Sequence, residues 1–285
     1  MRSSSFLALK IFLNSLSKLE VICVITQVSF KLLFSLSVSK FKIYTKQFDT
    51  KDKNIDRKIY HSIRVMEVSK DIATRLNLTQ EQIEIASIIG LLHDIGRFDQ
   101  YKIHQTYRDL ESFDHGDYGV EILKNNIRNY VKTDKYDDLI FKAIKNHNKF
   151  AIEEGLNSEE LLFAKIIRDA DKTDILYESA NIFFKGDEEK VNSSTVTDEV
   201  FDEVMNKKLV KRKKGRRIDY IDNVISVIAM VFDINFKETF QIINEKNYVI
   251  DTLKRYHLKD DVSEKRLRII EKFVSDYIFE KCKES

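Results

Sequence analysis

Five of the six histidines lie within one stretch of the 285-residue chain, and two of them stand directly beside an aspartate. The five are His61, His93, His104, His115 and His147, and the aspartates are Asp94 and Asp114. A single histidine near a helix end is more often a cap or a surface residue than a ligand. A set of imidazoles interleaved with carboxylates, however, offers the donors that first-row transition metals accept.

The adjacent pair His93 and Asp94 points most directly to a metal. Neighbouring residues on a helix project about 100° apart, so both can grip one ion only from a helix end or a facing groove. Gly90–Leu92 before the pair and Ile95 after it are small or apolar, which places two ionisable groups where burial without a partner is costly. A metal satisfies both. Imidazole with carboxylate suits Mn²⁺, Fe²⁺, Co²⁺, Ni²⁺ or Zn²⁺ better than Ca²⁺.

The order of the candidate ligands resembles that of the HD-domain metal-dependent phosphohydrolases. His61 comes first, then LLHDIGRF with the His–Asp pair, then RDADKTDIL with Asp171. FDHGDYGVEIL with His115 and AIKNHNKF with His147 are similar to the segments that carry the extra histidines of two-metal members. The resemblance spans roughly Tyr44 to Leu176.

This resemblance implies an all-helical bundle with a divalent-metal site. It implies that one ion is bound by His61, His93, Asp94 and Asp171, and that Asp94 bridges to a second ion held by His115 and His147. Whether one or two ions bind, and which metal, is left open at this point.

The activity implied by the resemblance is hydrolysis of a phosphate ester. A divalent ion activates water at neutral pH and neutralises charge on phosphoryl oxygens. Arg97 follows the His–Asp pair where the family often has a basic residue, and could grip a phosphate bidentately or form a surface salt bridge. We expect Asp94 and Arg97 to be catalytic. His104 is a candidate general acid at a substrate entrance shared with Lys102 and Arg108.

Differences from several families of HD-domain proteins narrow the range of expected substrates. After HDIGR the chain reads FDQYKIHQTYRD and lacks the GYP-type stretch of the cyclic dinucleotide phosphodiesterases. It also lacks the domains that accompany alarmone hydrolases and is short for the large deoxynucleoside triphosphate hydrolases. We therefore expect a nucleotide or another small phosphomonoester or diester. The alternatives are a non-catalytic metal- or nucleotide-binding sensor or interaction protein and, as a lesser one, a cyclic (di)nucleotide phosphodiesterase.

Helices must position these residues, because the chain has no proline, only 7 glycines and many helix-forming residues. Apolar residues at helical spacing predict a helix around His61. Thr79 with Gln82 three residues later forms a capping box, which starts the helix that carries His93 and Asp94 in its last turn. Gly96 is expected to end that helix.

A loop with at most a short helix is expected at Arg97–Asp114, followed by helices from His115 and over Tyr136–His147. Each of the two helices has a histidine at one end.

Another capping box, Asn157 with Glu160, predicts the start of the helix that carries Asp171. Asp174 shares more of the face of Asp171 than Asp169 does. Either flanking carboxylate could orient a ligand histidine or act as a cap.

C-terminal to about Asn181 the pattern predicts a loop at Gly186–Thr197, a buried helix over Asp219–Phe240 and an amphipathic helix over Lys265–Cys282. The basic run Lys207–Arg217 suits a solvated helix end, with an anionic-partner patch as the alternative. The expected organisation is an HD-type metal-binding core at residues 41–185 with a C-terminal helical extension at 186–285 packed on it.

Composition bounds the remaining possibilities. Interspersed charges, 48 basic and 46 acidic, give a net charge of +2 and no field that would attract nucleic acid. Cys23 and Cys282 form no CxxC motif, which fits a reducing cytoplasm. Residues 1–40 are an apolar extension in which Val21–Val38 could be a membrane anchor, an amphipathic segment packed on the domain, or an extension upstream of the natural start. Oligomeric state is not predicted.

Overall fold

The computed structural model describes residues 37–183, 185–211 and 218–284. This part of the chain is helical and contains no β-strand, which confirms the all-α fold class. Its α-helices are α3 (Lys53–Arg75), α4 (Gln80–Leu92), α5 (Ile95–His104), α6 (His115–Asn126), α7 (Asp137–Asn146), α8 (Ser158–Asn181), α9 (Glu188–Asn192), α10 (Asp198–Met205), α11 (Tyr220–Ile228), α12 (Lys237–Glu245), α13 (Tyr248–Leu253) and α14 (Asp261–Lys281). Short 3-10 helices are η1 (Asp109–Glu111), η2 (Ile127–Asn129) and η3 (Ala229–Asp233).

Capping boxes start two of the helices that carry site residues, as the sequence predicts. At α4 the Thr79 side chain accepts from the backbone N–H of Gln82, and at α8 the Asn157 side chain accepts from that of Glu160. In both boxes the glutamine or glutamate side chain accepts in return from the cap's own N–H. Each cap satisfies otherwise unpaired N–H groups and contributes about 1 kcal/mol.

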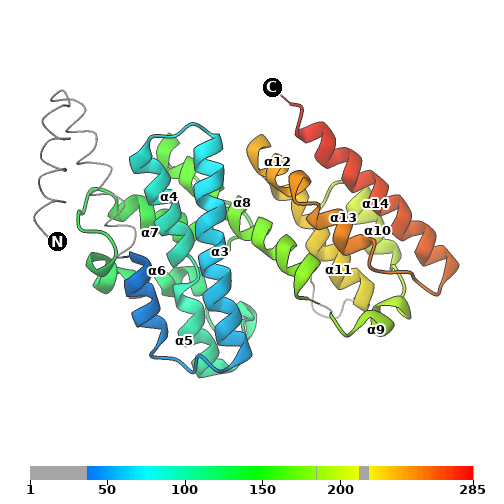
Figure 1. Cartoon of the computed structure of the whole chain (residues 1–285), viewed down its shortest axis with the longest axis horizontal. Helices are drawn as coiled ribbons and strands as arrows, with labels where there is room; N and C mark the ends of the chain where they lie inside the picture. The colour runs from blue at the N-terminus through cyan, green and yellow to red at the C-terminus, as the bar shows by residue number, and fades with distance from the viewer. Residues whose placement is uncertain (1–36, 184, 212–217, 285) are drawn as a thin grey trace, which may run out of the picture.

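The first bundle is built around α3 and α8. α3 packs against α4 and α8, α7 packs against α6 and α8, and α5 packs against α6 (Figure 1). Leu91, Leu92 and Ile95 are fully buried in its core, which fixes the junction between α4 and α5 where His93 and Asp94 lie. The predicted burial of this pair is confirmed, since His93 is 0 % and Asp94 2 % exposed.

Helix α8 joins two apolar cores, as Figure 1 shows by its course from the first bundle to the C-terminal helices. Buried apolar side chains of α8 up to Ala170 belong to the first core, and Leu176 belongs to the second. Ile242 of α12 also belongs to the first core, and α12 and α13 contact α8. The C-terminal helices therefore pack directly on the bundle. The domain boundary at residue 185 stays a prediction.

The segment Arg97–Asp114, predicted as a loop that could hold a short helix, begins within α5, which occupies residues 95–104, and also contains η1. Gly96 does not end α4. It lies in the first turn of α5, where an added Cβ would be 2.5 Å from the carbonyl oxygen of His115 and 2.9 Å from the nitrogen of Gly119. This glycine is required by the close approach of α5 and α6 rather than by a helix end.

The single helix predicted over Asp219–Phe240 is also wrong, because α11, η3 and α12 divide this segment. The backbone N–H groups of Asn235 and Phe236 donate to the carboxylate of Asp169 on α8, at 2.9 and 3.0 Å. Those two groups are thereby taken out of any continuous helical ladder. The loop predicted at Gly186–Thr197 contains the short helix α9.

Two predicted features lie wholly or partly outside the described residues. They are residues 1–36 of the apolar extension, with almost all of Val21–Val38, and residues 212–217 of the basic run. Among the helices of the described ranges, none combines the length and the apolar character that a membrane span requires.

Candidate metal centre

The four ligands predicted for the first ion converge where α3, α4, α5 and α8 meet. His61 Nε2 lies 3.2 Å from His93 Nε2, 3.4 Å from Asp94 Oδ2 and 3.1 Å from Asp171 Oδ1. His93 Nε2 lies 3.5 Å from the same Asp94 oxygen and 3.6 Å from Asp171 Oδ1. Both imidazoles are buried, whereas the Asp171 side chain is 21 % exposed. Two nitrogens and two carboxylates thus surround one point.

The two additional histidines lie on the other side of Asp94. His115 begins α6 and His147 follows α7, and their Nε2 atoms are 2.9 Å apart. Asp94 Oδ1 is 3.3 Å from the first of these nitrogens and 3.6 Å from the second. One Asp94 oxygen therefore faces each pair of histidines, so that two potential metal-binding groups share this carboxylate.

Backbone carbonyls fix the tautomer of two imidazoles. His93 Nδ1 donates to the carbonyl of Gly90 at 2.8 Å, and His147 Nδ1 donates to the carbonyl of Ile144 at 2.6 Å. A carbonyl oxygen can only accept, so the proton is on Nδ1 and the Nε2 of the neutral ring carries a lone pair. These lone pairs are directed at the shared carboxylate and the opposite histidine.

Carboxylates orient the other two imidazoles. His61 Nδ1 donates to Asp174 at 2.7 Å, and Asp174 also accepts from Arg64 Nε at 2.6 Å. His115 Nδ1 donates to Asp109 at 2.7 Å. Asp174 thus orients His61, which is one of the two roles that the sequence suggests for the carboxylates flanking Asp171. Asp109 was not singled out, because it lies in the segment interpreted as a loop and its partner is fixed only by the fold.

The half of the centre that contains His61, His93 and Asp171, here called the first half, favours a positive charge. Burial and Lys58 lower the pKa of His61, but hydrogen bonds to Asp171, Asp174 and Asp94 outweigh them and raise it to about 10. Burial opposes ionisation of Asp94, yet Lys58 and the neighbouring histidines hold its pKa well below the ordinary value. The pKa of Asp171 is likewise held low by its two histidine partners, against the effect of burial. Ionised carboxylates therefore surround a nitrogen that retains a proton or takes up a metal.

The second half holds neutral imidazole. Burial lowers the pKa of His115 to about 4. Burial raises the pKa of Asp109, but the hydrogen bond and charge of His115, together with Arg97, bring it well below its ordinary value. The ring is therefore neutral near pH 7, with Nδ1 protonated toward Asp109 and Nε2 able to bind a metal.

Two cations lie beside Asp94, the carboxylate that both groups share. Lys58 Nζ donates to Asp94 Oδ2 at 2.7 Å. Lys58 lies outside the ligand motifs, although it precedes His61 by three residues and so shares a helix face with it. Arg97 Nη1 donates to Asp109 Oδ1 at 2.8 Å. Its Nε lies 3.5 Å from Asp94 Oδ1 and has no hydrogen-bond partner among the described residues.

The centre opens onto a cleft of about 360 Å³ between the first bundle and the C-terminal helices. Its lining includes four of the six predicted ligands, which are Asp94, His115, His147 and Asp171. The remaining lining residues are Lys58, Arg97, Asp109, Asn148, Lys149, Phe150, Arg168, Lys172, Ile175, Leu209, Val210, Ser226, Met230 and Asp233. The ligands are therefore buried on one side and accessible on the other.

The predicted entrance residues Lys102, His104 and Arg108 do not line this cleft. His104 is exposed, and its ring packs edge-on against Phe113 at 5.5 Å between centroids. The structure does not bring His104 to the metal ligands, and the general-acid role predicted for it gains no support from the geometry.

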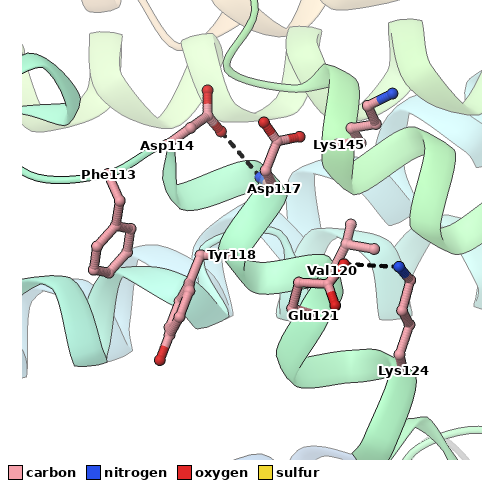
Figure 2. Close-up of a pocket in the computed structure, with 8 residues that line it drawn as sticks. All are labelled: Phe113, Asp114, Asp117, Tyr118, Val120, Glu121, Lys124 and Lys145. Carbon is pink, nitrogen blue, oxygen red and sulfur yellow. Dashed lines mark hydrogen bonds and ion pairs between the residues drawn. The ribbon is translucent and has the colours of Figure 1, made fainter.

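A separate cavity of about 520 Å³ lies on the outer side of α6 (Figure 2). In Figure 2 Asp114 accepts from the N–H of Asp117, and Lys124 pairs with Glu121. None of the clustered histidines lines it. These contacts are an ordinary helix cap and a surface ion pair, so this cavity is not part of the metal centre.

The donor set fits divalent transition ions. Each half offers two imidazole nitrogens and carboxylate oxygen, the mixture that Mn²⁺, Fe²⁺, Co²⁺, Ni²⁺ and Zn²⁺ accept. A third grouping, His61 with Asp174 and Glu178, is instead an ion-pair network, because Arg64 binds both carboxylates.

Residues 59–176 match the family described as HD domain. This chain carries an HD domain. The match includes all six predicted ligands and ends within α8, so the C-terminal helices lie beyond it. The resemblance stated from the motifs is thereby confirmed for these residues, and the HD domain is the one that metal-dependent phosphohydrolases share. Neither the curated proteins nor the solved structures gave a match.

Proposed function

We propose that this HD protein is a divalent-metal-dependent hydrolase of a phosphate ester carried by a nucleotide or another small molecule. The observation that carries the proposal is the convergence of four histidine Nε2 atoms on one carboxylate. They form two pairs, 3.2 Å and 2.9 Å apart, one on each side of Asp94. Ring nitrogens that face each other across such distances repel unless a proton or a metal ion lies between them.

We assign six side chains to two ions. His61, His93 and Asp171 would hold one ion, His115 and His147 would hold the other, and Asp94 would serve both. Divalent ions bound there would supply an activated water and neutralise the developing charge on a phosphoryl group. The protein's part is to aim each imidazole through its Nδ1 hydrogen bond, so that Nε2 faces the ion.

We assign phosphate binding to the cations at the cleft. Lys58 lines the cleft beside Asp94, and 14 % of its side chain is exposed. An ammonium in this position can pair with a phosphoryl oxygen as readily as with Asp94. Arg97 braces Asp109 and offers its unsatisfied Nε–H at the same edge, so it contributes to orienting His115 as well as to the charge of the site.

The test is hydrolysis of a panel of substrates with Mn²⁺, Co²⁺ or Ni²⁺. Phosphate release is measured for nucleoside phosphates, phenyl phosphate and glycerol 3-phosphate, and ring opening to the linear product is measured for a cyclic dinucleotide. We expect activity that a chelator removes and that Asp94→Ala abolishes. His257→Ala is the matched control, because this histidine is outside the cluster and its side chain is 78 % exposed. Equal activity in Asp94→Ala would refute the proposal. Tight metal and nucleotide binding without turnover would support a non-catalytic sensor instead.

A further inference from the structure

We propose that the C-terminal helices complete the substrate site, by supplying an apolar wall that holds the organic group of the phosphate ester. The inference rests on the proposed function for the position of the phosphate, at the metal ligands. The apolar wall consists of Phe150, Ile175, Leu209, Val210 and Met230, all of which line the same cleft as Asp94 and Asp171. Three of these five side chains lie C-terminal to the HD domain match.

The apolar side chains of this wall are exposed to the cleft, beside the charged metal centre. Phe150 is 76 % exposed, and the other four are only partly buried although they lie beside a highly charged centre. Apolar side chains gathered in one cleft, next to convergent polar groups, are typical of a small-molecule site. Ser226 also lines the cleft, and its hydroxyl already donates to the carbonyl of Asn223.

The buried side chain of Arg168 holds the two sides of the wall at a fixed separation. Arg168 on α8 is 4 % exposed, and its guanidinium donates to the carbonyls of Asn146 and Lys149, directly before Phe150. The same guanidinium donates to Asp233 in η3 at 2.8 Å. One side chain therefore ties the segment carrying Phe150 to the segment carrying Met230.

The neighbouring carboxylate on α8 secures the rest of the C-terminal side. Asp169 is fully buried and accepts from the N–H groups of Asn235 and Phe236 and from the hydroxyl of Thr239, at 2.9–3.0 Å. Asp171, two residues later, is a metal ligand in the proposed site. The short segment 168–171 thus sets the distance between the apolar wall and the metal ligands.

The chemistry of the apolar wall selects the class of substrate. A flat apolar group gains free energy by leaving water against such side chains, whereas a polyol or a zwitterion would lose hydrogen bonds there. The cleft volume of about 360 Å³ is at the small end of ligand pockets, about 300–1,000 Å³, so it suits a group the size of one nucleoside. We therefore infer a phosphomonoester with one aromatic organic group, and not a polyol phosphate.

Steady-state kinetics with Mn²⁺ and three substrates test this inference. Adenosine 5′-monophosphate and phenyl phosphate present a flat aromatic group, and glycerol 3-phosphate does not. We expect Phe150→Ala and Met230→Ala to lower kcat/KM about tenfold to a hundredfold for the two aromatic esters, mainly through KM, and to leave glycerol 3-phosphate unchanged. Phe279→Ala is the matched control, because Phe279 lies on α14 outside the cleft and is 53 % exposed.

An equal loss of kcat/KM on all three substrates, or no loss on any of them, would refute the proposed role of the apolar wall. Calorimetric binding of adenosine 5′-monophosphate to the metal-loaded protein separates this failure from that of the proposed function. If wild type binds without turnover and Phe150→Ala weakens binding while Phe279→Ala does not, the apolar wall stands and the hydrolase proposal falls. If the nucleotide does not bind to wild type, or binds equally to Phe150→Ala, the apolar wall is refuted.

Discussion

Replacement of Asp174 by asparagine isolates the effect of a residue that touches the metal centre only through His61. The carboxylate accepts from His61 Nδ1 at 2.7 Å and from Arg64 at 2.6 and 2.9 Å, and it is 1 % exposed. Asparagine keeps the shape but removes the charge. A hydrogen bond to an ionised group contributes about 1.5–3 kcal/mol and a neutral one about 0.5–1.5 kcal/mol. The exchange therefore costs about 1–1.5 kcal/mol, or about tenfold in metal affinity.

The assay is competitive titration of Zn²⁺ or Mn²⁺ into metal-free protein, with the free energy of unfolding measured in parallel. Asp174→Asn should weaken binding at the half that contains His61 about tenfold, and leave the other half unchanged. The control is Asp71→Asn, which removes an exposed carboxylate from an ion pair with Arg75. Wild-type affinity in a folded Asp174→Asn protein would show that this carboxylate does not orient the ligand.

Three further outcomes are expected. Asp109→Asn should weaken the ion held by His115 about tenfold to a hundredfold, seen as lower metal content after dialysis; full content would contradict this. Metal affinity at the half with His61 should rise about tenfold per pH unit between about pH 6 and 9, because the ion must displace the proton that His61 retains with its pKa of about 10. The half with His115 should show no such dependence, because the pKa of His115 is about 4 and its ring is already neutral. Titrations of His115→Ala and His61→Ala report each half separately, and identical pH profiles would refute the assignment. Gly96→Ala should lower the free energy of unfolding by about 1–3 kcal/mol in urea denaturation, because its Cβ would meet the His115 carbonyl at 2.5 Å; an unchanged midpoint would show that α5 and α6 separate freely.

The sequence predicted the elements whose signals are local. The capping boxes at Thr79 and Asn157 place the starts of α4 and α8 correctly, and the ordered motifs supply all six candidate ligands that the fold brings together. Such signals depend on residues three or four positions apart, so they survive without knowledge of the fold.

What could not be predicted depends on contacts between distant segments. Gly96 was interpreted as a helix end because glycine favours that position, but its neighbour is the His115 backbone. The break before α12 arises because Asp169, 66 residues away, captures the N–H of Asn235. Lys58 reaches Asp94 across 36 residues. In each case the partner is chosen by tertiary packing, which overrides the local preference.

The metal content of the purified full-length protein tests the shared centre most directly. After loading with Mn²⁺ and removal of free ion, elemental analysis should find about two ions per chain in wild type, as expected for a pair of sites bridged by one carboxylate. We expect Asp94→Ala to retain neither ion, and His257→Ala to retain both. Wild-type protein without bound metal, or Asp94→Ala with the wild-type content, would contradict a centre built on His61, His93, Asp171, His115 and His147 around Asp94.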